Sequence, residues 1–378
     1  MLQEYLIAQR AALLDIAARL VAHESPSGDK VRCDALVTLL VERFAALGAV
    51  EHHANPAGGD HVLVRVTAPG APAGARPALV LCHYDTVWPA GTVATRPFRV
   101  EGDTAYGPGL YDMKASIAMA ELALRAVAAL GLSLARPVIL LITSDEEIGS
   151  PSSRSLIEAT AAGCAHTLVL EPPIEPAGAL KTARKGIGMF TIAISGRAAH
   201  AGVEPERGAS AITELAHQIL ALNALADPAQ GTTVNVGLVR GGSGRNVVPA
   251  EALMEVDVRA WTSAEAARLE GAIRSLAPVT PGVSLAVAGG FNRPPLERTP
   301  AGAALFAQAQ ALGTTLGLAL DEGATGGGSD GNFTAALGVP TLDGLGAPGA
   351  GAHAVHEQIS VSGALQRAAL LALLLTRL

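Results

Sequence analysis

Three consecutive acidic residues follow an apolar run in this sequence. The run 138–142 has the composition of a buried strand, and Asp145, Glu146 and Glu147 come soon after it. Neighbouring carboxylates repel one another, and a bound cation would offset that repulsion. Glu146 and Glu147 face opposite ways in a strand or turn, so we expect one to bind a metal ion and the other to act as a general base. A solvated loop is the alternative interpretation of this motif.

Further candidate ligands stand where predicted strands end or helices begin. His83 and Asp85 follow an apolar run two residues apart, so both point to one face, where His83 can bind a metal and Asp85 can hold it in place. Asp112 precedes a predicted helix, and Glu171 ends another apolar run. A polar strand edge and a helix N-cap are the simpler explanations for each residue alone. Strand ends gather at one edge of an α/β sheet, so these residues can converge into a site for metal-assisted hydrolysis.

The order of predicted elements indicates an α/β domain that is interrupted by an inserted domain. Strands and helices alternate in residues 1–184, and the same pattern returns in residues 293–378. Residues 185–292 instead have the pattern of antiparallel strands with two helices, near 209–225 and 264–275. We therefore predict an α/β catalytic domain in two parts with an inserted α+β domain.

Composition excludes several classes of partner. The 378 residues are 49% hydrophobic with a net charge of −7 and no basic stripe, so neither nucleic acid nor an acidic membrane is expected as a partner. The three cysteines form no CxxC motif, which favours reduced thiols and a cytoplasmic location. The first twenty residues have the pattern of one amphipathic helix rather than a signal peptide, and the Gly/Pro-rich segment 69–77 is typical of a surface loop.

A set of motifs runs in order through nearly the whole chain: CHYDTVW, YGPGLYDMKAS, TSDEEIGS, LEPP, AAHAG, GRNVVPAEA followed by DVR, TGGGSD and GAHAVHE. This ordered set resembles the di-zinc aminoacylase/carboxypeptidase family, most of all its glutamate carboxypeptidase (carboxypeptidase G) branch. The resemblance implies a phosphorylase/hydrolase-like zinc-exopeptidase catalytic domain. It also implies that the inserted α+β domain is ferredoxin-like and serves as a lid and dimerisation domain.

The resemblance implies two zinc ions per subunit, with cobalt or manganese as substitutes, and five ligands. His83 and Glu171 would bind one ion, Glu147 and His353 would bind the other, and Asp112 would bridge both. The motif GAHAVHE contains a second histidine, His356, and spacing alone does not choose between the two. The family pattern of a histidine, three residues and then a glutamate selects His353.

Catalytic roles follow from the same resemblance. Glu146 would be the general base and acid, and Asp85 would orient His83. The peptide bond between Asp112 and Met113 is expected to be cis. In the inserted domain, a histidine matching His200 reaches the partner subunit's active site and stabilises the oxyanion, although a strand-end cap is the alternative.

Substrate contacts are expected from five other positions. Asn246 would help bind the substrate carbonyl or carboxylate, and Arg259 would hold the α-carboxylate with its two-pronged guanidinium. Arg293 resembles a second carboxylate contact, although its segment also has the composition of a linker. The loop TGGGSDGN lacks the ending of a nucleotide-binding loop. Relatives use this loop to bind the substrate carboxylate, which assigns the backbone N–H groups of Gly327 and Gly328 to that role.

The sequence therefore predicts a homodimeric zinc-dependent metallopeptidase that cleaves an amide next to a free C-terminal α-carboxylate, through metal-bound hydroxide and Glu146. Its substrate would be a small peptide or an N-acyl amino acid. The alternatives are an N-acyl-amino-acid deacylase or dipeptidase with the same site, and a non-hydrolytic binding protein. Relatives that prefer glutamate carry a lysine where this chain has Ala179, with Lys181 two residues later, so the preferred side chain stays open.

Overall fold

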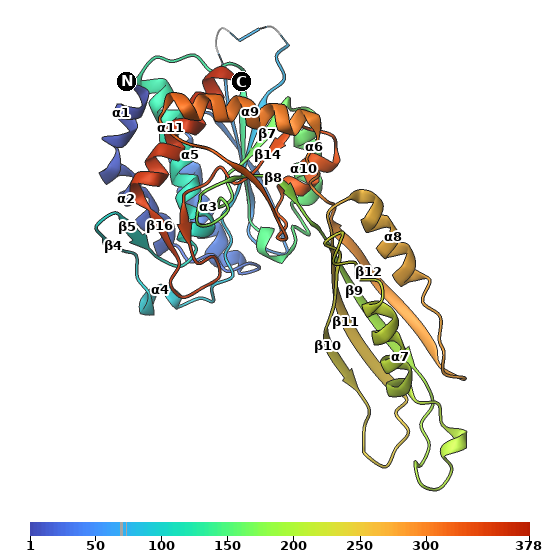
Figure 1. The fold of residues 1–378 in the computed structure, drawn as a ribbon. Coiled ribbons are helices and arrows are strands. Elements are labelled where there is room, and N and C mark those ends of the chain that lie inside the picture. Colours follow the sequence, from blue (N-terminus) through green and yellow to red (C-terminus); the bar gives the residue numbers. More distant parts are fainter. Residues whose placement is uncertain (69–70, 73) are drawn as a thin grey trace. The chain divides into compact units, whose positions relative to one another are not determined.

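The polypeptide divides into two units that have separate hydrophobic cores (Figure 1). The computed structural model describes residues 1–68, 71–72 and 74–378, so the predicted loop at 69–77 lies partly outside the described residues. The first unit comprises residues 1–182, 298–325 and 329–378. The second comprises residues 183–297 and 326–328, whereas the sequence placed the changes of domain at 184/185 and 292/293.

The first unit is built on a mixed six-stranded sheet. Its strands, in spatial order, are β1 (Ala49–His53), β2 (His61–Val66), β6 (Val138–Thr143), β3 (Ala78–His83), β7 (His166–Val169) and β14 (Thr341–Leu342). β3 and β6 are buried along their whole length, which explains their unbroken apolar sequences. β1 pairs antiparallel with β2, and β2 pairs antiparallel with β6.

The carboxyl ends of three parallel strands meet at one edge of this sheet. β3 pairs in parallel with both β6 and β7, and His83 at the end of β3 lies opposite Thr143 at the end of β6. The segments that follow these three strands therefore leave the sheet side by side. The predicted convergence of strand ends is confirmed.

Helices cover both faces of the sheet. Against one face lie α1 (Leu2–Ile7), α2 (Arg10–Ala22), α3 (Lys30–Phe44), α5 (Ala115–Ala129), α9 (Pro300–Thr315) and α11 (Val361–Arg377). Against the other face lie α6 (Arg154–Ala162) and α10 (Gly331–Ala336). The prediction of a single N-terminal helix is wrong, because the N–H of Gln9 bonds Leu6 O in a tight turn that ends α1 before α2 begins.

A small sheet holds the C-terminal histidine loop against the segment before α5. Its strands are β15 (Gly349–Ala350), β16 (Gln358–Ser360), β5 (Thr104–Tyr106) and β4 (Arg99–Glu101). β16 pairs antiparallel with β5, so residues 351–357 lie next to the chain that leads to Asp112. The remaining elements of this region are α4 (Thr92–Thr95), β8 (Leu180–Arg184) and β13 (Glu322–Thr325).

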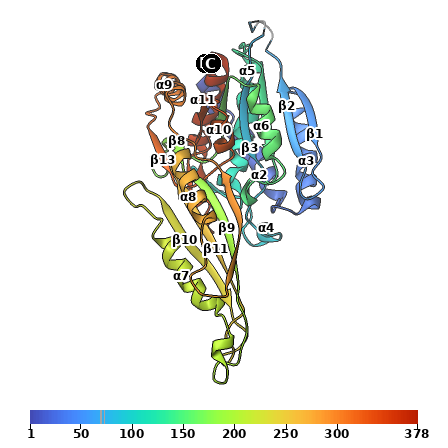
Figure 2. The same ribbon diagram turned by 90° about the vertical axis from the view of Figure 1, so that its right-hand side faces the viewer.

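The second unit is an α+β fold, as predicted. Its antiparallel sheet has the order β10 (Thr233–Gly241), β11 (Glu251–Ala260), β9 (Gly186–Ser195) and β12 (Ser284–Arg293). Alternate residues of β9 and β11 are buried under α7 (Ala211–Asn223) and α8 (Ser263–Arg274), which Figure 2 shows from a second direction. The expectation that Arg293 lies in a linker is wrong, because this residue ends β12 and is buried.

No helix within the described residues combines the length and the apolar character that a membrane crossing needs.

Candidate metal centre

Two histidines lie on either side of one aspartate. His83 Nε2 is 3.1 Å from Asp112 Oδ1 and 3.5 Å from Glu171 Oε1. His353 Nε2 is 3.5 Å from Asp112 Oδ2 and 3.1 Å from Glu147 Oε2. Each histidine therefore meets one oxygen of Asp112 and one glutamate. The five side chains form two nitrogen and oxygen donor sets that share a single carboxylate.

These side chains come from five separate segments of the first unit. His83 ends β3, Glu171 follows β7, and Glu147 lies in a single 3₁₀ turn after β6. Asp112 lies in the irregular turn that leads into α5, and His353 lies in the loop between β15 and β16. The edge of the six-stranded sheet positions His83, Glu171 and Glu147. The small sheet brings Asp112 and His353 to that edge.

Glu146 also faces this cluster. Donor atoms of His83, Glu146 and Glu171 lie within 4.8 Å of one another, as do those of His83, Asp112 and Glu147. Both glutamates approach His83, but Glu146 lies beside Glu171 and Glu147 lies beside Asp112. This arrangement agrees with the expectation that the two residues differ in role.

Asp85 connects His83 to the turn that carries both glutamates. His83 Nδ1 lies 3.1 Å from the backbone oxygen of Asp85 and 3.4 Å from its carboxylate. The carboxylate of Asp85 accepts hydrogen bonds from the backbone N–H groups of Glu146 and Glu147, each at 3.2 Å, and from the hydroxyl of Ser27 at 2.6 Å. Ser27 was not identified from the sequence.

Glu357 holds the segment that contains Asp112. Its buried carboxylate accepts hydrogen bonds from the backbone N–H groups of Gly109 (2.8 Å), Tyr111 (2.8 Å) and Asp112 (3.1 Å). The indole N–H of Trp88 donates to it as well, at 2.8 Å. Burial raises the pKa of Glu357, while these four donors favour its ionised form. The sequence indicated Glu357 only as the end of a motif, without this role.

The peptide bond between Asp112 and Met113 is cis, as predicted. The next residue, Lys114, is almost fully buried and donates a hydrogen bond to the backbone oxygen of His23 at 2.8 Å. Burial lowers the pKa of Lys114 to about 8. This lysine anchors the first turn of α5 to the end of α2.

The electrostatics of the cluster fit a pair of divalent cations. Burial raises the pKa of Glu147 to about 7, and hydrogen bonds to Asp112 and Glu147 raise the pKa of His353 to about 10. Burial alone would lower the pKa of His83, but the surrounding carboxylates outweigh it and raise this pKa. Glu147 Oε1 is buried and has no hydrogen-bond partner among the described residues. Zinc is commonly bound by imidazole nitrogens and carboxylate oxygens, and Glu147 Oε1 is available as one such ligand atom.

The second histidine of the C-terminal motif takes a different place. His356 lies over Gly351, where a side-chain Cβ would come within 2.9 Å of the imidazole. Gly351 has φ +83°, and His353 itself has φ +60°, so the loop turns sharply at both residues. It is His353, the residue selected from the motif, that this turn directs towards Asp112 and Glu147.

In the second unit, two predicted motifs lie side by side. The N–H of Ala201 donates to Asn246 O at 2.9 Å, and His200 forms a backbone bridge with Val247. The side chains of His200 and Asn246 are exposed, and the ring of His200 accepts a hydrogen bond from the N–H of Gly202 at 3.2 Å. The ring of His200 thus caps the backbone locally, as the alternative interpretation expected, and it is also exposed at the surface of the second unit.

Arg259 already has partners within the second unit. Its guanidinium pairs with the carboxylate of Asp257, two residues earlier on β11, at 2.9 Å. Its Nη1 also donates to Gly326 O at 3.0 Å. Arg259 thus reaches the glycine-rich loop that was predicted to share its role.

Two more arginines contact this loop. Arg184 Nη1 donates to Gly327 O at 3.2 Å and to Gly328 O at 2.9 Å. Arg293 packs so closely on Gly328 that a Cβ there would lie 2.7 Å from Arg293 Cδ. The predicted residues Arg293, Gly327 and Gly328 therefore come together, and Arg184 joins them without any signal in the sequence that pointed to it.

Comparisons with known proteins agree with this architecture. Residues 79–377 match the Peptidase family M20/M25/M40. The chain is 30% identical over 369 residues to carboxypeptidase G2 of Pseudomonas sp. (strain RS-16), which covers 95% of this chain and 87% of the relative. Among solved structures, aminopeptidase PepT from Bacillus cereus matches with a TM-score of 0.77 at 22% identity, over 97% of this chain and 98% of that one. The YXEP protein of Bacillus subtilis, described as a dinuclear metal binding peptidase, matches with a TM-score of 0.65 at 16% identity, over 98% and 99%.

The predicted family is thereby confirmed by a match over most of the chain. Together with the paired histidine and carboxylate clusters, it places the protein in a class of hydrolases. The chain belongs to peptidase family M20/M25/M40 and is an enzyme of its metallopeptidase and amidohydrolase type.

Proposed function

We propose that this enzyme hydrolyses an amide or peptide bond next to a free C-terminal α-carboxylate, with two zinc ions bound per subunit. The observation that carries the proposal is the position of Asp112 between two histidines: one oxygen faces His83, which also meets Glu171, and the other faces His353, which also meets Glu147. His83 and Glu171 would hold one ion, Glu147 and His353 the other, and Asp112 both. Cobalt and manganese are candidate substitutes.

The metal pair would supply electrophilic activation of the amide carbonyl and would lower the pKa of a water molecule. Glu146 is proposed to take the proton from that water and to deliver it to the leaving amine. Two features support this role: the carboxylate lies in the His83 and Glu171 group, and its backbone N–H is fixed by Asp85. Asp85 is proposed to keep His83 oriented while it holds the Glu146 turn.

Residues of the second unit are proposed to bind the carboxylate of the substrate. Arg259, Arg293 and the N–H groups of Gly327 and Gly328 are the proposed contacts, because all of them belong to one loop and its arginine neighbours. The guanidinium of Arg259 is shared with Asp257, so the substrate would compete with that internal ion pair. Asn246 is proposed as a further contact to the substrate carbonyl or carboxylate.

His200 is proposed to stabilise the oxyanion in the active site of a partner subunit. Its exposure at the surface of the second unit, next to Asn246, supports a role outside the unit that carries it. This assignment requires a homodimer formed through residues 185–292. A cytoplasmic location remains a prediction of the composition.

The identity of the C-terminal residue separates this proposal from its nearest alternative, an N-acyl-amino-acid deacylase or dipeptidase with the same metal site. Ala179 stands where glutamate-preferring relatives carry lysine, and it is buried. Lys181 is buried too, and its backbone is tied to Asp343 through two hydrogen bonds. A non-hydrolytic binding protein is disfavoured because the complete ligand set and Glu146 are present.

A panel of N-acyl and peptidyl amino acids tests the proposal, with amine release followed by mass spectrometry. We expect turnover that stops in chelator and returns when zinc is added, and substrates with an amidated C-terminus should be poor. Preference for a C-terminal glutamate would assign the carboxypeptidase G type, and preference for other acyl amino acids would assign the alternative. No turnover on any amide by protein that contains two metal ions would overturn the proposal.

A further inference from the structure

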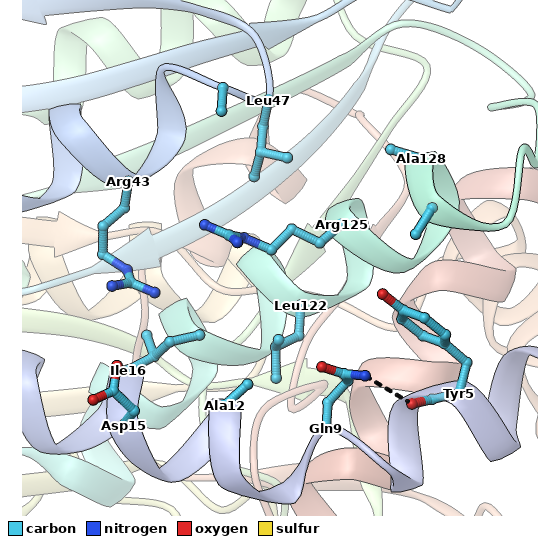
Figure 3. A pocket seen from close by; sticks show the side chains of 12 residues that line it. Tyr5, Gln9, Ala12, Asp15, Ile16, Arg43, Leu47, Leu122, Arg125 and Ala128 are labelled. Carbon is cyan, nitrogen blue, oxygen red and sulfur yellow. Dashed lines mark hydrogen bonds between the residues drawn. The ribbon is translucent and has the colours of Figure 1, made fainter.

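A cavity of about 650 Å³ lies in the first unit, away from the proposed metal ligands (Figure 3). It is lined by residues of α1 and α2, by the end of α3 and the residues that follow it, and by the C-terminal half of α5. Ile16, Leu47 and Leu122 give it an apolar floor and wall, and the ring of Tyr5 faces it from one side. Its volume is within the range of pockets that bind small organic molecules, about 300–1,000 Å³.

Two arginines extend into this cavity and share one buried carboxylate. Arg43 binds Glu121 through two nitrogens, at 2.6 and 2.9 Å, and Arg125 Nη2 lies 2.7 Å from Glu121 Oε1. Glu121 is only 1% exposed. One carboxylate offsets only one of the two guanidinium charges, so a positive charge remains beside the apolar wall.

The acidic residue that lines the cavity, Asp15, does not supply the missing negative charge. Asp15 is exposed and forms an ion pair with Arg19, four residues later on α2, at 3.3 Å. Arg125 Nη2 lies against Glu121, and the Arg125 side chain is 49% exposed. Among the described residues, Arg125 Nη1 and Nε donate no hydrogen bond, so these donors can serve a ligand in the cavity that Arg125 lines.

From these contacts we infer that the cavity is a binding site for a small organic carboxylate with an apolar body. The carboxylate binds Arg125 and Arg43, where it relieves the repulsion between two guanidinium groups held on one glutamate. The apolar body lies against Leu47, Leu122 and Ile16. The site is separate from the metal centre, since Arg125 stands ten residues, roughly 15 Å, along α5 from its first residue. This inference does not rest on the proposed function.

Octanoate serves as the probe, in calorimetric titrations of the metal-loaded protein. Acetate lacks the apolar body and octanamide lacks the charge, so both should bind at least about tenfold more weakly. Arg125→Gln should weaken octanoate binding by about tenfold or more, because it removes a charged donor while Glu121 keeps its pair with Arg43. Ala128→Phe, at an exposed position of the cavity wall, should abolish binding by filling the space.

Arg274→Gln is the matched control. Arg274 forms the same kind of helical pair, with Glu270 four residues earlier at 2.7 Å and with 47% of its side chain exposed, but it lies in α8 of the second unit. Its loss should leave octanoate binding unchanged. Equal affinity of wild type and Arg125→Gln, or of octanoate and octanamide, would overturn the inference. Binding that vanishes in chelator would place the carboxylate on the metal centre instead and would overturn it as well.

Discussion

The backbone N–H of Asp112 donates a hydrogen bond of 3.1 Å to Glu357, which lies 245 positions later in the chain. The same carboxylate accepts the indole N–H of Trp88, five residues after His83. Glu357 also lies four residues after His353. One buried acid thus ties together the three chain segments that carry His83, Asp112 and His353.

Glu357→Gln should weaken metal binding by about 10- to 100-fold, because an amide NH₂ would face N–H donors and loosen the Asp112 segment. Competition with a chromophoric chelator measures this affinity. Glu158→Gln, which removes a partly exposed acid paired with Arg154 on α6, is the control and should leave the affinity unchanged. Wild-type metal affinity in Glu357→Gln would show that the Asp112 segment keeps its position without this carboxylate.

Asp85→Asn should lower both metal affinity and kcat, by about 10- to 100-fold, since the carboxylate of Asp85 lies 3.4 Å from His83 Nδ1 and accepts hydrogen bonds from the backbone N–H groups of Glu146 and Glu147. Ser27→Ala removes only one of the donors to this carboxylate and should have a smaller effect. Metal content and steady-state kinetics on the best substrate of the panel measure the two quantities. Unchanged kcat with full metal content in Asp85→Asn would contradict the role of Asp85.

Arg259→Lys should raise KM by about tenfold or more, with a smaller change in kcat, because lysine cannot make the two-pronged contact to a carboxylate. The effect should be confined to substrates with a free C-terminal carboxylate. An amidated substrate should be hydrolysed equally slowly by both enzymes. An identical rise in KM for free and amidated substrates would mean that Arg259 acts only by supporting the loop at Gly326.

His166→Leu should change how stability depends on pH. His166 is buried on β7 and its Nε2 has no hydrogen-bond partner among the described residues; burial, with a contribution from Arg136, lowers its pKa from 6.5 to about 4. Below pH 6.5 the unfolded chain binds a proton there and the folded protein does not, so the wild type loses stability as the pH falls towards 4. Leucine removes this loss.

Urea denaturation of both proteins at pH 8 and pH 5 measures the difference. Relative to wild type, His166→Leu should gain about 2 kcal/mol in free energy of unfolding between these two pH values. Because each comparison is made at one pH, the titration of other groups cancels. A stability difference that is the same at both pH values would show that His166 binds a proton equally well in the folded and unfolded states.

Several of the proposed metal ligands could be predicted because apolar runs that form buried parallel strands end abruptly in polar residues. His83 and Glu171 illustrate this rule, since each directly follows such a run. His353 required the resemblance to a family, because neither its loop nor the two-residue strand before it has a recognisable period. The small sheet that positions it was not predicted for the same reason.

Other elements were missed because their determinants are tertiary. β1 has the sequence AVEHH and is only partly buried, so it carries no strand pattern. β12 contains Gly289, which lies so close to β9 that a Cβ would come within 2.1 Å of Met189 O, and glycine is not typical of a strand interior. Arg184 contacts carbonyls 143 and 144 positions away, a separation that no local pattern reveals.

The most direct test of the central claim is the measurement of turnover and metal content together in Glu146→Gln. We expect the variant to retain two metal ions per subunit and to bind substrate, while kcat falls by about 10²- to 10⁴-fold, because the group that moves the proton is lost. The conservative change keeps the backbone N–H that bonds Asp85. Near-normal kcat with both metal ions bound would contradict the assignment of Glu146 as the base, and loss of one metal ion would show that Glu146 is a ligand instead.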